Sequence, residues 1–307
     1  MNKIVEKIQT KLSQKEDVLT ELRNLPGSEL NSFLLELFRL KSEDISPSEL
    51  LNQFGNNRFV TPSETNIIKI KKNELEWLKY AEKQGFSPVN LSPLAPFGSC
   101  SVVGLVNQNN VVSALRGTEI VSDATNVLAL KIANDMKGAK NKQQVLKYST
   151  THRHVRGQYF TNPEYSAHFS VFCLASGGSD RGNYHFELSQ LNEHFSILFH
   201  LLSRKFPGNQ LTVKFYLKSN SEHIQSLVNN NTDPFWSDKV VEFQEEFENR
   251  YYQTIHFKIF LKKDGQEIDL ADGGDVDWTQ KLLGNKKHRL FISGAGLELI
   301  EKMSERL

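Results

Sequence analysis

A run of basic and polar side chains in the middle of the chain has the residue types that phosphate chemistry needs. The run is HRHVRGQ at residues 152–158, and it continues a strand-like pattern that resumes at residues 168–172. Guanidinium groups such as those of Arg153 and Arg156 stabilise the charge that develops on phosphate oxygens. Polar groups of this kind are costly to bury unpaired. The run therefore predicts a ligand cleft, or else a set of side chains that satisfy one another or point to solvent.

Two histidines in this run suggest a different chemistry. His152 and His154 are two residues apart on a predicted strand, so they share a face of that strand. Such a pair can bind a metal, but the nine scattered histidines offer no obvious third ligand. We expect two ordinary strand histidines and no metal site.

Strands and helices mix in the part of the chain that must position the run. Apolar alternation predicts half-buried strands at residues 211–217 and 255–261, and further strands are predicted at 147–154, 166–175, 268–270 and 290–292. A long helix is predicted at residues 186–206, ended by Pro207 and Gly208. Strands that pair with nearby strands, with helices gathered elsewhere, predict an α+β fold: an antiparallel sheet flanked by helices.

Several shorter elements are predicted from local patterns. Residues 73–84 read as an amphipathic helix with Leu75, Leu78 and Ala81 on its inner side. A hairpin is expected to pair residues 102–105 with 111–115. Ser122 is the expected cap of the next helix, and a last helix is expected over residues 294–303.

The first part of the chain is predicted to be a small helical region. Residues 4–22 keep a rough helical period, and a capping box with Ser46, Pro47 and Glu49 starts a later helix. A polar stretch then breaks the pattern, so we expect a helical region at residues 1–58 and a core domain at 59–307. The region either packs on the core or forms an arm that binds tRNA or a protein.

The composition is typical of a cytoplasmic globular protein. The 307 residues carry a net charge of +1, which gives no global basic field for nucleic acid. Cys100 and Cys173 are too few for a disulfide framework, so we expect a reduced cytosolic protein. The N-terminus has charges throughout and no apolar run, which argues against a membrane span.

Residues 65–305 resemble the catalytic core of class II aminoacyl-tRNA synthetases, above all histidyl-tRNA synthetase. Residues 76–93 are similar to motif 1, a helix and then a strand with a proline. ALRGTE at 114–119 looks like the family's LRPE-T segment, and HRHVRGQ resembles motif 2, FRYERPQ. YSAHF at 165–169 sits where the family has RYREF.

The later family segments follow in the same order. RYYQTIHF at 250–257 resembles DYYTGTVFE, ADGGDVD at 271–277 resembles A-GGRYD, and GAGLE at 294–298 resembles motif 3. The resemblance implies a class II synthetase-like fold. It also implies catalytic positions at Arg153 and Arg156. The implied ligand-binding positions are Arg116, Thr118, Glu119, Gln158, His168, Phe169, Tyr251, Tyr252, Gly274, Gly294 and Gly296.

The resemblance also shows where the catalytic pattern is lost. Val155 takes the position of the motif 2 glutamate, Leu299 that of the motif 3 arginine and Asp275 that of the GGRYD arginine, while Phe247 falls on a further catalytic arginine. Each loss is expected to cost about 2–4 kcal/mol of transition-state stabilisation if it behaves like a lost oxyanion donor. Together these changes predict weak or absent amino-acid activation.

Three functions follow from these observations. The first is a histidyl-tRNA synthetase paralogue without an anticodon-binding domain, which binds an amino acid, a nucleotide or a related small ligand in a regulatory or accessory role. The regulatory subunit of ATP phosphoribosyltransferase is a family member of that kind. The second is a ligase that adenylates an amino acid or other carboxylate with ATP and Mg and passes it to a carrier or other acceptor. The third is an interaction protein with an empty pocket.

The expected partners follow from the same resemblance. We expect a homodimer through the motif 1 region and a small-molecule ligand. A protein or carrier partner is open, and the sequence does not decide whether tRNA binds.

Overall fold

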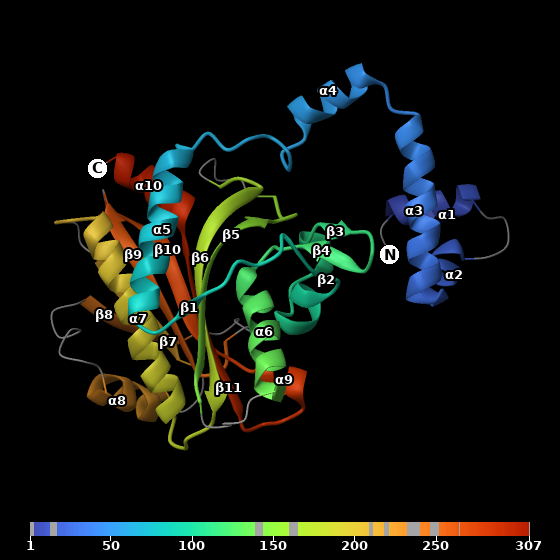
Figure 1. The fold of residues 1–307 in the computed structure, drawn as a ribbon. Coiled ribbons are helices and arrows are strands. Elements are labelled where there is room, and N and C mark those ends of the chain that lie inside the picture. The colour runs from blue at the N-terminus through green and yellow to red at the C-terminus, as the bar shows by residue number, and fades with distance from the viewer. Residues whose placement is uncertain are drawn as a thin grey trace.

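The computed structural model describes residues 3–12, 17–138, 144–159, 165–208, 211–217, 221–231, 240–245, 252–263 and 265–306. An eight-stranded sheet forms its centre (Figure 1). Neighbouring strands pair antiparallel except at the two edges, where β1 with β5 and β7 with β8 are parallel. The strands in spatial order are β1 (Ser87–Pro88), β5 (Leu146–Val155), β6 (His168–Ser179), β11 (His288–Gly296), β10 (Gln266–Val276), β9 (Ile255–Lys263), β7 (Leu211–Leu217) and β8 (Val240–Glu245). The predicted α+β fold with an antiparallel sheet is confirmed.

Helices cover both faces of this sheet. One face carries α5 (Ile67–Lys83), α7 (His185–Lys205), α8 (Ser221–Asn231) and α10 (Leu297–Glu305); the other carries α6 (Ala124–Gly138) and α9 (Trp278–Leu283). Helices can pack on both faces because successive side chains of a strand point to opposite faces of the sheet. In β6, Phe172 and Leu174 join the apolar cluster under α7, whereas Val171 and Cys173 join the cluster under α6.

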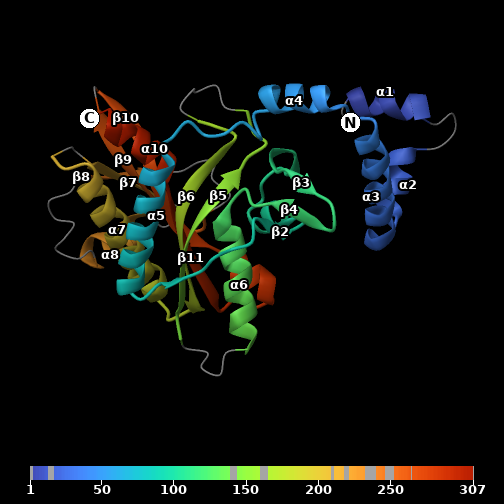
Figure 2. The same ribbon diagram turned by 45° about the horizontal axis from the view of Figure 1, so that its top comes forward.

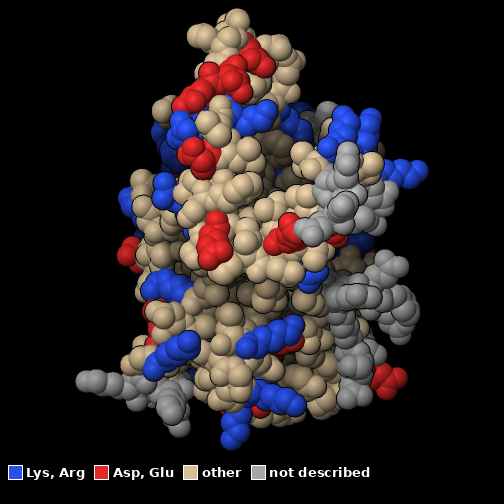
Figure 3. All heavy atoms as spheres, turned by 90° about the vertical axis from the view of Figure 1, so that its right-hand side faces the viewer, with Lys and Arg blue, Asp and Glu red and all other residues tan. Residues whose placement is uncertain are grey.

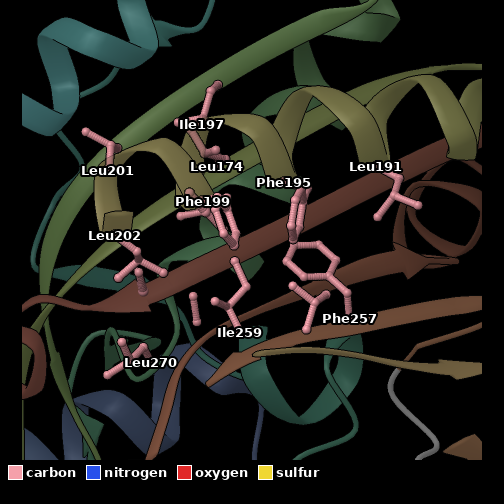
Figure 4. Packing of buried hydrophobic residues seen from close by; sticks show 14 of the residues in the cluster. Leu174, Leu191, Phe195, Ile197, Phe199, Leu201, Leu202, Phe257, Ile259 and Leu270 are labelled. Carbon is pink, nitrogen blue, oxygen red and sulfur yellow. The ribbon is translucent and has the colours of Figure 1, made fainter. Parts of the chain in front are cut away.

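Helix α7 seals the larger apolar cluster. Figure 4 shows its side chains, among them Leu191, Phe195 and Phe199, lying over strand β9, which carries Phe257 and Ile259. The Phe195 and Phe257 rings meet edge to face with centroids 5.8 Å apart. The long helix predicted at residues 186–206 is confirmed.

The predicted hairpin between residues 102–105 and 111–115 is wrong. Residues 99–103 form a π-helical turn, η1 (Ser99–Val103), and a 3-10 turn follows, η2 (Gln108–Asn110). The actual hairpin joins β3 (Ser113–Ala114) to β4 (Thr118–Ile120), and β2 (Leu94–Pro96) lies on the other side of β4. Arg116 and Gly117 make the reversal with φ of 66° and 67°, a left-handed geometry that glycine adopts without strain.

Other local predictions also need correction. Helix α5 begins at Ile67 and buries Ile70, Trp77 and Ala81, whereas Leu75 is exposed. The cap of α6 is Asp123 rather than Ser122, because its carboxylate accepts the Thr125 backbone N–H at 2.9 Å. The last helix begins at residue 297, since residues 294–296 still belong to β11. Helices α8 and α9 and strand β8 lack a pattern strong enough to predict them.

The N-terminal residues are helical as predicted. The helices are α1 (Lys3–Leu12), α2 (Val18–Asn24), α3 (Gly27–Glu43) and α4 (Pro47–Asn56). Ser46 caps α4 by accepting the Glu49 N–H at 3.2 Å. Figures 1 and 2 show α1–α3 standing apart from the sheet domain. A boundary near residue 58 stays a prediction.

One side chain ties α3 to the core. Asn31 Oδ1 accepts the backbone N–H groups of Arg116 at 2.9 Å and Gly117 at 3.2 Å. Phe33, Leu37 and Phe38 of α3 are exposed. On the side shown in Figure 3, basic and acidic side chains are spread among wide areas of other residues. Among the described residues, no helix is long and apolar enough to cross a membrane.

Candidate functional site

A cavity of about 530 Å³ opens on the α6 face of the sheet. Its wall comes from the start of α6, the ends of β5 and β11, the first half of β6, the middle of β10 and the first turns of α10. The charged side chains on this wall are Asp123, Arg156, Asp269, Asp272, Glu298 and Lys302. Four carboxylates thus face two cations, so the wall is acidic on balance.

The end of strand β5 and the residue just after it present alternate side chains to this cavity. His154 and Arg156 line the cavity, and the Arg156 guanidinium lies 5.2 Å from the centre of the Phe169 ring, which also lines it. Arg153 and Val155 are not among the lining residues, because neighbouring residues of a strand point to opposite faces. Arg156, rather than Arg153, therefore lies on the cavity wall.

Arg153 instead contacts Glu298, a residue of the cavity wall, from outside the cavity. Its Nη1 lies 2.7 Å from Glu298 Oε1, and its Nε donates to His168 Nδ1 at 2.8 Å. The other oxygen of Glu298 accepts the Ser63 hydroxyl at 3.0 Å, and His168 Nε2 donates to the Thr61 carbonyl at 2.7 Å. These bonds tie the segment after α4 to the start of α10.

Tyr252 and Asp272 form one polar corner of the cavity. The Tyr252 hydroxyl donates to Asp272 Oδ2 at 2.9 Å, and the Tyr252 ring stacks on His256 with centroids 4.2 Å apart. Burial works to raise the pKa of Asp272, but its contacts with His256 and Tyr252 outweigh burial and lower that pKa. Asp272 therefore carries a negative charge into the cavity at neutral pH.

Asp269 stands beside this corner in a different electrostatic setting. Burial, and next the charge of Asp272, raise the pKa of Asp269. Lys258 opposes that effect with Nζ 2.8 Å from Asp269 Oδ2. The two carboxylates thus differ in how firmly they hold a proton, and Asp272 is the stronger anchor for a cationic group.

Gly274 lies directly beneath Tyr252. A Cβ at this position would come within 2.2 Å of the Ile255 carbonyl oxygen and 2.6 Å of Tyr252 Cδ1. Only a residue without a side chain fits here, so Gly274 shapes the cavity through Tyr252 rather than by lining it.

Glu119 lies away from the cavity and supports the local backbone structure. It is fully buried, and its carboxylate accepts the Gly98 N–H at 2.8 Å, the Cys100 N–H at 3.0 Å and the Gln108 amide at 3.0 Å. The bonds to Gly98 and Cys100 hold the start of the η1 turn in place. Thr118 is similarly engaged, because its hydroxyl donates to the Leu115 carbonyl at 2.8 Å.

The residues predicted from the sequence therefore fall into three groups. The cavity is lined by Arg156, Gln158, Phe169, Tyr252, Gly294 and Gly296. Six others lie elsewhere in the described part of the chain: Arg116, Thr118, Glu119, Arg153, His168 and Gly274. Tyr251 lies outside the described residues.

Several residues that line the cavity were not predicted as site residues from the sequence. Among them are the titratable residues His154, Asp123, Asp269 and Asp272. His154 shares a strand face with Arg156, so the strand period alone could have indicated it once Arg156 was singled out. Nothing in the sequence singles out Asp123 or Asp269.

The residues that replace the family's catalytic residues lie in different environments. Leu299 lines the cavity, so an apolar side chain stands on the wall at that point. Asp275 is buried and accepts the backbone N–H groups of Thr254 at 2.9 Å and Ile255 at 2.6 Å. Burial raises the pKa of Asp275. Phe247 lies outside the described residues.

The described part of the chain holds no group of three or more His, Cys, Asp or Glu side chains arranged for a metal ion. The His152 ring is instead within hydrogen-bond distance of two carbonyl oxygens, those of Arg153 at 3.0 Å and Ser92 at 3.1 Å. Its centroid lies 6.1 Å from that of His154.

Solved structures share this fold at low sequence identity. A Bacillus halodurans protein described as an ATP phosphoribosyltransferase regulatory subunit/histidyl-tRNA synthetase superimposes with a TM-score of 0.60 and 12% identity, over 80% of this chain and 83% of that one. A histidine–tRNA ligase subunit from Alicyclobacillus acidocaldarius gives 0.59 and 11%, over 81% and 96%. The chain has the class II synthetase-like fold that its sequence segments predicted.

The fold does not by itself separate the members of that class. The RNA-binding domain of threonyl-tRNA synthetase from Cryptosporidium parvum also matches, with a TM-score of 0.59 and 9% identity over 77% of this chain and 63% of that one. No protein-family model matches the sequence, and no curated protein matches it.

Proposed function

We propose that this protein is a histidyl-tRNA synthetase-like paralogue that binds a small ligand in the cavity without making aminoacyl-tRNA, in a regulatory or accessory role. The observation that carries the proposal is the cavity wall itself. Arg156, Asp272 and Tyr252 bring polar groups into a concave site, while Leu299 adds an apolar side chain where the family pattern has an arginine. Convergent polar groups in a cavity of this size favour a small-molecule ligand.

The charge of the wall argues against a bound triphosphate. Phosphate groups are stabilised by cations and backbone donors, and the lining residues offer four carboxylates against two cations. Glu298 is paired with Arg153 and Asp269 with Lys258, while the lowered pKa of Asp272 keeps that carboxylate charged. ATP therefore fits this donor set poorly. An amino acid or another amine-bearing molecule fits it better.

The alternative function is an adenylate-forming ligase that passes an amino acid or other carboxylate to a carrier or other acceptor. Its support is Arg156, a guanidinium that lines the cavity beside an aromatic ring. ATP and Mg belong to this alternative only. Among the described residues that line the cavity, Arg156 and Lys302 are the only cations, whereas phosphate transfer needs several cations around the phosphates.

The proposed assembly is a homodimer through the motif 1-like region. Helix α5 and strand β1 form this region at one edge of the sheet. Ile67, Ile68 and Leu75 of α5 are more than half exposed, at 56%, 61% and 54%. Burial of such side chains favours association. Light scattering of Ile68→Glu should give a monomer if this face holds the second copy.

Amino-acid-dependent pyrophosphate exchange separates the two functions. We expect no exchange with any of the twenty amino acids, and we expect a thermal shift with at least one amino acid or other amine-bearing molecule. Gly294→Leu should abolish that shift, because the new side chain enters the cavity and its Cβ meets only ordinary contacts at 3.6 Å. Gly138→Leu is the matched control at a position with nothing within 4 Å. Robust exchange would establish the ligase instead.

A further inference from the structure

His154 has a fixed tautomer. Its Nε2 lies 3.0 Å from the backbone nitrogen of Ala124 at the start of α6. A backbone amide can only donate, so Nε2 must be the acceptor of this bond. The neutral ring consequently carries its hydrogen on Nδ1, and the ring offers that hydrogen as a donor.

This Nδ1 has no hydrogen-bond partner among the residues that the structure describes. The side chain is 1% exposed, so water does not satisfy the group from the protein surface. A buried donor left unpaired costs roughly 1–3 kcal/mol, and native proteins pair the great majority of such groups. His154 also lines the cavity, which gives the donor a place to find a partner.

A second buried histidine shows the usual arrangement. His194 in α7 is also fully buried, and both of its ring nitrogens have partners. Nε2 lies 2.8 Å from the Ser176 hydroxyl, and Nδ1 lies 2.9 Å from the Ser293 hydroxyl. The difference between the two histidines is the open Nδ1 of His154.

We propose that the Nδ1–H of His154 donates a hydrogen bond to an sp² oxygen or nitrogen of the ligand, which makes His154 a recognition residue of the cavity. This inference rests on the proposed ligand-binding function and names one feature of the ligand. The acceptor is a carbonyl oxygen, an amide oxygen or an unprotonated ring nitrogen. Phe169, with its ring centre 5.9 Å from that of His154, favours a planar group next to this acceptor.

Burial keeps this donor neutral. Burial lowers the pKa of His154 to about 3, and of its charged neighbours Asp123 opposes this effect while Arg156 and His152 add to it. The ring therefore does not change its charge between pH 5 and 8. The Nδ1–H donor is therefore present across that range.

A pair of probes tests the inference. Benzamide carries a planar ring and a carbonyl acceptor, whereas benzylammonium has the ring and a cation but no acceptor. The variant is His154→Gln, whose amide oxygen can still accept the Ala124 N–H while the Nδ1 donor is gone. We expect benzamide affinity, measured by ligand-detected NMR, to fall about tenfold in His154→Gln, the size of one hydrogen bond between neutral groups. Benzylammonium affinity should stay unchanged, because the acidic wall holds it.

His194→Gln provides the control, since its ring faces the other apolar cluster and both nitrogens are already bonded. It should leave benzamide affinity at the wild-type value. Equal benzamide affinity for wild type and His154→Gln would overturn the inference alone. Loss of both probes in His154→Gln would also overturn it, because the substitution would then have acted on the cavity as a whole. Failure of wild-type protein to bind either probe would overturn the ligand-binding function together with the inference.

Discussion

Arg153 in β5 and Glu298 in α10 form an ion pair with 2.7 Å between Nη1 and Oε1. The two residues are 145 positions apart, and they come from the two segments that most resemble synthetase motifs 2 and 3. The Glu298 side chain is 6% exposed and that of Arg153 is 39% exposed. The pair thus joins a buried carboxylate to a half-exposed guanidinium. It lies between the cavity and the segment after α4.

A double-mutant cycle on this pair should give a measurable coupling. Arg153→Met leaves the buried Glu298 without its cation, so we expect it to destabilise more than Glu298→Gln does. The coupling energy is expected to be about 1 kcal/mol, because solvent screens the exposed end of the pair. Urea unfolding of the wild type, both single variants and the double variant measures it. Strictly additive effects would show that the pair contributes no stability.

Gly274→Ala should be strongly destabilising. The added Cβ would lie 2.2 Å from the Ile255 carbonyl oxygen, which is backbone and cannot move aside. We expect a loss of about 3 kcal/mol in unfolding free energy together with loss of ligand binding, as overpacking of a tight core implies. Gly55→Ala, inside α4 with nothing within 4 Å, is the control and should stabilise by about 0.5–1 kcal/mol. Similar urea midpoints for the two variants would contradict the packing at Gly274.

Two buried histidines predict acid sensitivity. Burial lowers the pKa of both His154 and His194 from 6.5 to about 3. Below pH 6.5 the unfolded chain takes up protons that the folded chain does not, so this contribution is complete above pH 6.5 and is lost as the pH falls toward 3. Each histidine should remove about 1.4 kcal/mol of stability per pH unit in that window. Urea unfolding measured from pH 7 to 4 gives the unfolding free energy at each pH. This free energy should fall less steeply with decreasing pH for His194→Gln than for wild type. An unchanged dependence on pH would contradict the lowered pKa of His194.

Leu299→Arg tests whether the cavity has lost a phosphate contact. Leu299 lies on the cavity wall, so an arginine there adds a guanidinium to it. We expect pyrophosphate affinity, measured by calorimetry, to rise about tenfold, the gain of one charge-assisted contact. Amino-acid activation should remain absent, because the other positions are unchanged. Leu299→Gln, of similar length without the charge, should leave pyrophosphate affinity at the wild-type value.

The sequence was sufficient for several strands of the large sheet and for α7, because these elements have strong patterns. Residues 211–217 and 255–261 alternate cleanly, and the apolar face of α7 repeats over many turns, so period alone locates these elements. The region of residues 99–117 was not predictable in this way. Its conformation depends on the buried Glu119 carboxylate, which gathers donors from Gly98, Cys100 and Gln108. Such tertiary bonds leave no periodic trace in the sequence.

The candidate site was predicted in part for a related reason. Family-like segments led to Arg156, Phe169 and Tyr252, which do line one cavity. The same reading favoured Arg153, because an alignment of short motifs does not fix which residues of a strand face the cavity. A shift of one residue moves a side chain to the opposite face of a sheet. The register of β5 against β6, with His154 opposite Phe169, decides this and is set by the whole sheet.

The edge of the sheet at β1 limits how copies of this chain can join. β1 spans two residues, and one of them is Pro88, which has no N–H to donate. The following Val89 already uses both of its backbone groups: its N–H donates to Ser149 and its carbonyl accepts the Thr150 hydroxyl. This edge therefore gives a neighbouring strand little to pair with, which protects the folded chain from edge-to-edge aggregation. A second copy meeting it would have to be recognised by side chains, and a substitution on the surface of α5 could then change the partner without disturbing the sheet.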